Sequence, residues 1–167
     1  MREAVRLASA APACRFVLRG SDTAGSAGGA FGLELPRTPL RASSAEERHA
    51  LWLGPDDWLL LAPEKDRGDI EQAFGKAAEP HTLVDVSHRN VGLIVEGAAA
   101  EIVLNSGCPL DLDLAAFPVG MCTRSIFDKA EIVLWRTGEQ TFHVEVWRSF
   151  APYVEALLRE AAVEVGA

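Results

Sequence analysis

The stretch LVDVSHRNVGLIVEGAAAEIVLNSG, residues 83–107, predicts three structural elements in a row. Residues 83–86 are mainly apolar and predict a short strand. After a polar break, residues 91–96 alternate in the period-2 pattern of a second strand that has one face more buried than the other. Residues 98–104 are helix formers, and Gly107 suits the end of that helix because glycine takes the left-handed conformation without steric cost. Hairpins and helices are predicted on both sides of this stretch.

Composition limits the class of protein. The chain has 167 residues, 49% of them apolar, which fits a globular protein with a substantial core. Its formal charge of −8 and pI near 5.0 oppose binding to phosphate backbones, so we expect no nucleic-acid partner. No apolar run approaches the length that spans a bilayer, so we expect no membrane partner. Arg6 interrupts the small residues near the N-terminus, so we expect a cytoplasmic start and no export signal.

Cysteine and histidine spacing predicts neither a disulfide framework nor a metal site. The three cysteines are Cys14, Cys108 and Cys122; they contain no CxxC pair, and we expect reduced, packed thiols. The four histidines are His49, His81, His88 and His143, and no two have a metal-ligand spacing. His88 is the most interesting of the four because it lies in a predicted loop, and loops often carry functional residues. A single histidine in a loop, however, more commonly has a structural role or is simply solvated. The residues alone therefore predict no catalytic group.

The N-terminal part predicts a hairpin within residues 15–35. Residues 14–19 form the first strand candidate. Residues 20–32 are rich in Gly, Ser and Ala and lack the ending of a phosphate-binding loop, so a mobile hairpin loop is expected. Apolar residues alternate at Phe31, Leu33 and Leu35 and predict the return strand. The following residues 41–48 look like a polar linker.

The segment ALWLGPDDWLLLAP, residues 50–63, predicts a second hairpin around a Gly-Pro-Asp-Asp turn. Its return strand is almost continuously apolar, which indicates a central strand covered on both faces. Trp52 and Trp58 flank the turn and are placed to pair across it. Residues 66–78 then predict a helix with Ile70 and Phe74 on one face.

The C-terminal part repeats this pattern. Residues 108–120 read as an irregular connection, followed by strand candidates at residues 121–127, 130–136 and 141–147 and by a final helix. Residues 50–78 and 130–162 are therefore both a hairpin followed by a helix. We predict a single α+β domain over residues 1–167, with a core at about residues 40–162 and two duplicated halves, each a sheet with helices on one side.

Two segments carry a family resemblance. The DVSH sequence at residues 85–88, the strand that ends at Gly97 and the later Gly120 strand resemble the folate-binding domain of the aminomethyltransferase superfamily. The 50–63 hairpin and the block VDVSHRNVGLIVEG, in that order, more specifically resemble the gamma subunit of heterotetrameric sarcosine oxidase. This resemblance covers about residues 40–162 and implies a folate-binding-domain fold.

The resemblance also implies a function. An enzyme of this kind oxidatively demethylates sarcosine to glycine, makes hydrogen peroxide, and releases formaldehyde or forms methylene-tetrahydrofolate. FAD, FMN, NAD, zinc and tetrahydrofolate are implied for partner subunits, with none in this chain. The implied partners are the alpha, beta and delta subunits, and self-association is expected when the chain is isolated.

The resemblance implies no catalytic residue and only weak folate-like candidates: Asp128, Glu131 and Arg124. Lys129 and Ala130 occupy the positions that are acidic in the aminomethyltransferases, with Asp128 and Glu131 just outside them. A shift of one residue on a strand turns a side chain to the opposite face. Arg124, together with Arg136, is a candidate to hold an anionic glutamate tail, although two surface arginines are the simpler interpretation.

Two hypotheses from different classes follow. The first is an accessory subunit that buries an exposed apolar or aromatic patch against a partner. The second is a stand-alone folate-binding, one-carbon transferase-like protein, which would require an inward-pointing Asp128 or Glu131. A variant of the first is the equivalent subunit of another multimeric N-methyl amino acid oxidase or dehydrogenase.

Overall fold

The computed structural model describes residues 4–20 and 23–166, with the backbone alone for residues 23–26. Within these ranges the chain forms two compact units. Unit 1 contains the N-terminal segment up to Ala11 and the chain from Arg89 onward, and unit 2 contains the intervening residues 12–88. Each unit is described by itself.

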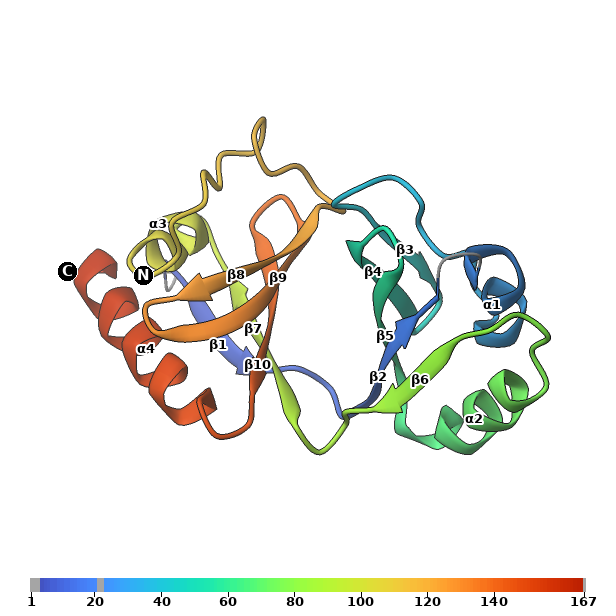
Figure 1. Ribbon diagram of the computed structural model, residues 1–167. Helices are drawn as coiled ribbons and strands as arrows, with labels where there is room; N and C mark the ends of the chain where they lie inside the picture. The colour runs from blue at the N-terminus through green and yellow to red at the C-terminus, as the bar shows by residue number, and fades with distance from the viewer. Residues whose placement is uncertain (1–3, 21–22, 167) are drawn as a thin grey trace. The chain divides into compact units, whose positions relative to one another are not determined.

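Unit 2 is a five-stranded antiparallel sheet with two helices on one face (Figure 1). The strand order is β3-β4-β5-β2-β6. The strands are β2 (Ala13–Arg19), β3 (Ala42–Ala45), β4 (Arg48–Gly54), β5 (Asp57–Pro63) and β6 (Thr82–Asp85). The helices are α1 (Thr23–Phe31) and α2 (Arg67–Gly75), the latter preceded by the 3-10 turn Glu64–Asp66.

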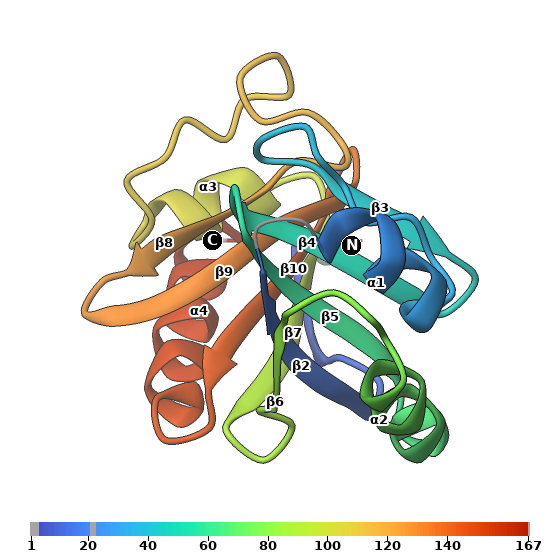
Figure 2. The same ribbon diagram turned by 45° about the vertical axis from the view of Figure 1, so that its right-hand side comes forward.

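Unit 1 is also a five-stranded antiparallel sheet with two helices on one face, seen from a second direction in Figure 2. The strand order is β1-β7-β10-β9-β8. The strands are β1 (Arg6–Ser9), β7 (Asn90–Glu96), β8 (Cys122–Phe127), β9 (Ala130–Gly138) and β10 (Thr141–Trp147). The helices are α3 (Ala100–Asn105) and α4 (Ala151–Gly166). The fold is therefore a mixed α and β architecture, as the sequence predicts.

The hairpin at residues 50–63 is confirmed. β5 lies in the middle of its sheet, and all of its residues except the last are buried. Trp52 pairs directly with Trp58 across the hairpin. Trp58, Leu60 and Ala62 pack into the core of unit 2 together with Ile70 and Phe74 of α2. The strands predicted around residues 83–97 and 121–147 also form, and the three cysteines are free and buried.

The mobile hairpin loop predicted at residues 20–32 is wrong where the structure describes it. Thr23–Phe31 is helix α1, so no return strand runs through Leu33 and Leu35; Ser21 and Asp22 lie outside the described residues. Ala27 and Phe31 lie one turn apart and are fully buried in the core. Gly32, with φ of 72°, ends the helix, and the Leu33 N–H donates to the Gly28 carbonyl at 3.0 Å. Burial of these two side chains therefore outweighs the low helix propensity of the glycines.

Two edge strands were not predicted. Residues 41–48 are not a linker, because they contain β3 and the start of β4. The segment near the N-terminus, for which the sequence predicts no strand, contains β1, which pairs with β7 from Arg6–Glu96 to Ser9–Leu93. Both strands have four residues and no fully buried side chain, so they lack the apolar alternation that marks a strand. Among the described residues no helix is long and apolar enough to cross a membrane.

Candidate functional site

The β8–β9 hairpin carries the three folate-like candidates. Ile126 pairs with Glu131 and Phe127 with Ala130, so Asp128 and Lys129 form the turn. Asp128 has a positive φ of 52°, a conformation that aspartate tolerates better than most residues. Its backbone N–H donates to the Gly107 carbonyl at 2.8 Å, which joins the turn to the end of α3.

Asp128 lies on the helix side of unit 1. The Tyr153 hydroxyl of α4 donates a hydrogen bond to its carboxylate, and this bond raises the pKa of Tyr153 above its ordinary value. Arg124 and Glu131 are exposed. Side chains alternate along a strand, and Phe127 of β8 and Ile132 of β9 enter the core, so Arg124 and Glu131 lie on the other face of the sheet. The structure therefore does not bring Asp128 together with the other two candidates.

Arg136 is not a surface arginine. Its side chain is 1% exposed, and all five of its N–H groups have acceptors within unit 1. The acceptors are the carbonyls of Leu112 (2.8 Å), Phe117 (2.9 Å), Gly138 (3.3 Å) and Glu139, and the Glu101 carboxylate. The guanidinium also lies 4.8 Å from the centre of the Phe142 ring. Arg136 thus holds the irregular 108–120 connection against the sheet and has no N–H left for a ligand.

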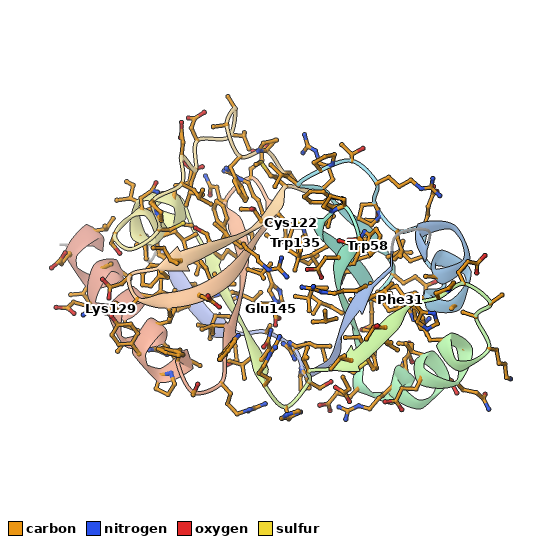
Figure 3. The ribbon with its side chains drawn as sticks, in the orientation of Figure 1. Phe31, Trp58, Cys122, Lys129, Trp135 and Glu145 are labelled. Atoms are coloured by element: carbon orange, nitrogen blue, oxygen red, sulfur yellow. The ribbon has the colours of Figure 1, made fainter. Side chains whose placement is uncertain are left out.

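A buried carboxylate that the sequence did not single out lies on the opposite face of the same sheet. Glu145 is 1% exposed, and its Oε1 lies 2.7 Å from Nε2 of His143. The His143 ring packs 5.8 Å from the Trp135 ring, measured between centroids. In Figure 3, Glu145 and Trp135 lie well away from Lys129 at the hairpin turn. Two residues of spacing on β10 place the histidine and the glutamate on one face, which is the only signal that the sequence offers.

Gly92 of β7 makes room for this pair. It lies opposite Glu145, and a Cβ there would be 2.7 Å from His143 Nε2, 3.0 Å from Glu145 Oε1 and 2.8 Å from the Ala10 Cβ. Because real Cβ atoms do not approach so closely, any side chain at this position displaces the pair.

We therefore expect Gly92→Ala to lower the free energy of unfolding by about 1–3 kcal/mol, the usual cost of overpacking. Urea denaturation followed by circular dichroism measures this change. Gly68→Ala is the matched control, since a Cβ at this exposed helical position meets nothing within 4 Å and should stabilise the helix slightly. Equal effects of the two substitutions would contradict the steric argument.

The DVSH segment makes a structural turn in unit 2. The Asp85 carboxylate accepts hydrogen bonds from the backbone N–H of Ser87 at 2.8 Å and from its hydroxyl, and Arg67 lies 3.3 Å away. The Ser87 hydroxyl oxygen accepts the Arg15 N–H at 2.9 Å, which fastens the turn to β2. Burial alone would raise the pKa of Asp85, but the Ser87 hydrogen bonds and the Arg67 charge outweigh it and hold the pKa below its ordinary value. His88 follows as an exposed residue.

This lowered pKa predicts a pH dependence. A carboxyl group whose pKa is lower in the folded state stabilises the fold above its unfolded pKa, and the contribution is lost as pH falls through the folded value. Asp85→Asn should therefore be less stable than wild type at pH 7, and the difference should shrink below about pH 4. Urea midpoints of both proteins at pH 7 and pH 3 check this. A difference that does not change with pH would show that Asp85 acts without its charge.

A metal site is not found among the described residues, where no group of three or more His, Cys, Asp or Glu side chains converges. Of the candidate folate residues, Asp128 accepts the Tyr153 hydrogen bond on the helix side of unit 1, and Glu131 and Arg124 lie on the strands at the other face of the sheet.

The fold is similar to that of a known class of proteins. The aminomethyltransferase T of the glycine cleavage system from Bartonella henselae superimposes with a TM-score of 0.71 over 94% of this chain and 46% of that chain. The identity is 16%, so this likeness shows the fold alone: an aminomethyltransferase-like domain architecture.

The family follows from closer matches. The model of the sarcosine oxidase, gamma subunit family matches residues 20–164, and the chain belongs to this family. It is 35% identical over 136 residues to the sarcosine oxidase subunit gamma of Corynebacterium sp. (strain P-1), which covers 81% of this chain and 67% of the relative. It is 38% identical over 118 residues to that of an Arthrobacter species, covering 69% of this chain and 57% of the relative. The match therefore spans little more than half of the second relative.

A solved structure agrees with the family. A chain of the heterotetrameric sarcosine oxidase from Corynebacterium sp. U-96, in complex with pyrrole 2-carboxylate, superimposes with a TM-score of 0.90 at 30% identity. The superposition covers 100% of this chain and 88% of that chain.

Proposed function

We propose that this chain is the accessory gamma subunit of a heterotetrameric sarcosine oxidase, assembled with alpha, beta and delta subunits. The complex would demethylate sarcosine to glycine and make hydrogen peroxide, with formaldehyde or methylene-tetrahydrofolate as the one-carbon product. The observation that carries the proposal is the superposition over the whole chain on a chain of such a complex, with a TM-score of 0.90.

In this proposal the gamma subunit performs no chemical step of its own. FAD, FMN, NAD, zinc and tetrahydrofolate would be bound by the other subunits. Folate-dependent transfer needs a carboxylate within hydrogen-bond distance of the reacting amine. The separation of Asp128 from Glu131 and the full engagement of Arg136 support a role outside the chemistry.

An exposed aromatic segment supports a role in assembly. At the junction of β10 and α4 the chain has three aromatic residues spaced three apart, and each is between 37% and 43% exposed: Trp147, Phe150 and Tyr153. Aromatic residues are enriched at protein interfaces because they combine a large apolar area with few rotatable bonds.

The cytoplasmic location and the organisation as a single domain stay predictions.

We further infer that the two units arose by duplication, and their topology supports this. Reading one sheet as β3-β4-β5-β2-β6 and the other as β8-β9-β10-β7-β1 matches every strand, and α1 and α2 then match α3 and α4 in chain order. The ladders match as well: Trp52 opposite Trp58 corresponds to Arg136 opposite Phe142. Both central hairpins have a register shift beside this pair. The difference is that β1 precedes its unit in the chain, whereas β6 follows its own.

Co-expression tests the proposed function. The alpha, beta and delta chains are produced with and without this chain, and sarcosine-dependent peroxide formation and the size of the complex are measured. We expect the tetramer and its activity to be lost without this chain and restored when it is added. Normal assembly and full activity without it would overturn the accessory role.

A thermal-shift titration of the isolated chain with tetrahydrofolate is the second arm. The proposal expects no rise in melting temperature, because ligand binding to the folded state alone would raise it. A rise that saturates with tetrahydrofolate would favour the stand-alone folate-binding protein instead.

A further inference from the structure

Unit 1 contains a groove between α4 and the β8–β9 turn, with a cavity volume of about 240 Å³. Apolar side chains of Phe127, Leu157 and Ala161 form part of its lining. Ser106, Gly107, Asp128, Glu160 and Glu164 complete it. This volume is below the range of about 300–1,000 Å³ that is usual for cofactor and small-molecule sites. The groove therefore suits a single long side chain better than a cofactor.

The position of the turn beside the groove depends on close packing. A Cβ at Gly107 would lie 3.0 Å from two atoms of the Phe127 ring and 3.1 Å from the Asp128 backbone nitrogen. Glycine at this position thus allows the turn to approach the end of α3, and the Gly107 carbonyl accepts the Asp128 N–H. Tyr153 holds the Asp128 carboxylate from the other side. Asp128 is consequently fixed at the edge of the groove by a backbone and a side-chain hydrogen bond.

The charges around the groove have one sign. Among the residues that the structure describes, the charged ones lining the groove are Asp128, Glu160 and Glu164, and no lysine or arginine lines it. Lys129 adjoins Asp128 in the turn but is not a lining residue, and Arg159 of α4 bonds Glu155 at 2.5 Å. An aliphatic stem over the apolar lining, with its cationic end among the carboxylates, would match both the shape and the charge.

Two of these charges are placed unfavourably within the chain itself. Glu160 and Glu164 are one turn apart on α4, where like charges repel. They also lie in the C-terminal part of a helix whose last turn has no basic residue, although the negative end of the helix dipole favours cations there. A cation in the groove would relieve both effects.

We propose that this groove receives a lysine or arginine side chain from a neighbouring chain of the oxidase complex. The inference rests on the proposed function, because it names the chemistry by which the gamma subunit docks. The groove is then an assembly contact of unit 1 and not a ligand site.

The test compares the double variant Glu160→Gln/Glu164→Gln with wild type. In the isolated chain we expect the variant to be the more stable one, because the repulsion and the dipole conflict are removed. At low salt we expect the variant to bind the other three, co-expressed chains with about tenfold lower affinity than wild type. Its affinity should also depend less on salt concentration. Glu71→Gln/Glu139→Gln removes two exposed charges outside the groove and should change neither affinity nor its salt dependence.

The outcomes separate the two proposals. If wild type itself does not assemble with the other chains, the proposed function fails. If wild type and both double variants assemble equally at every salt concentration, the proposed function stands and the groove contact is overturned. If isolated wild type self-associates in a salt-sensitive way and the groove variant does not, the occupant is a second copy of this chain, which also overturns the inference.

Discussion

Replacing Arg136 with methionine is expected to lower the free energy of unfolding by about 3–5 kcal/mol. Methionine fills much of the same space but donates no hydrogen bond. The carbonyls of Leu112 and Phe117 would lose their donors in a buried region, and the 108–120 connection would lose its anchor to the sheet. Urea denaturation of the purified chain, followed by far-UV circular dichroism, measures the loss.

Two further variants separate charge from geometry. Arg136→Lys keeps the charge but not the planar arrangement of five donors, so we expect it to retain little of the stability. Glu101→Gln should cost much less, because this side chain is 37% exposed and the carbonyls keep their donor. If the free energy of unfolding of Arg136→Met, measured in the same way, lies within about 1 kcal/mol of the wild-type value, Arg136 is not the anchor described above.

The second large effect is expected in unit 2. Trp58→Ala should lower the free energy of unfolding by about 3–5 kcal/mol, because it removes the largest buried side chain of that core and leaves a cavity. It also removes the donor that bonds the Pro36 carbonyl at 2.9 Å. The measurement is the shift of the urea midpoint at constant slope.

Trp58→Phe serves as the control for this prediction. It keeps an aromatic ring in the core and removes the hydrogen bond to Pro36, so we expect it to retain much of the stability that alanine loses. Similar losses for phenylalanine and alanine would show that the hydrogen bond, and not the packing of the ring, dominates at this position.

Arg136 and Trp58, the residues of these two predictions, show how the two units differ. At matching ladder positions, unit 2 has the Trp52–Trp58 pair and unit 1 has the Arg136–Phe142 pair. An aromatic residue lies on the central strand in both units, and its partner is a tryptophan in unit 2 and a buried arginine in unit 1. In unit 1 that arginine donates hydrogen bonds to the long irregular connection between α3 and β8.

The sequence predicts those parts of the fold that have a strong local pattern. The 50–63 hairpin and the strands around residues 83–97 and 121–147 combine apolar alternation with turn residues, and all of them form. β1 and β3 could not be found this way, because an edge strand of four half-exposed residues has no buried face to produce a pattern. α1 was missed because its glycines suggest a loop, while the buried Ala27 and Phe31 are separated by one helical turn.

The candidate site was predictable only in part. The position of Asp128 beside a turn could be inferred, but its bond to Tyr153 depends on where α4 packs. Arg136 follows Ile132 and Leu134 at intervals of two on β9, so alternation alone places it on the core face. Three of its five acceptors, on Glu101, Leu112 and Phe117, lie 19 to 35 residues away along the chain, and no spacing rule predicts that convergence.

The order of strands in unit 1 has a consequence for synthesis on the ribosome. β1 is made before all of unit 2, yet its partner β7 begins only at Asn90. The seven residues of β7 must therefore leave the exit tunnel before β1 has any ladder to join, and unit 2, whose strands are contiguous, can be complete by then. A delay of this kind leaves an unpaired strand on the nascent chain for the time needed to translate about 80 residues, which at 5–20 residues per second is roughly 4–16 s. The time for which chaperones can reach β1 is thus set by the topology of unit 1.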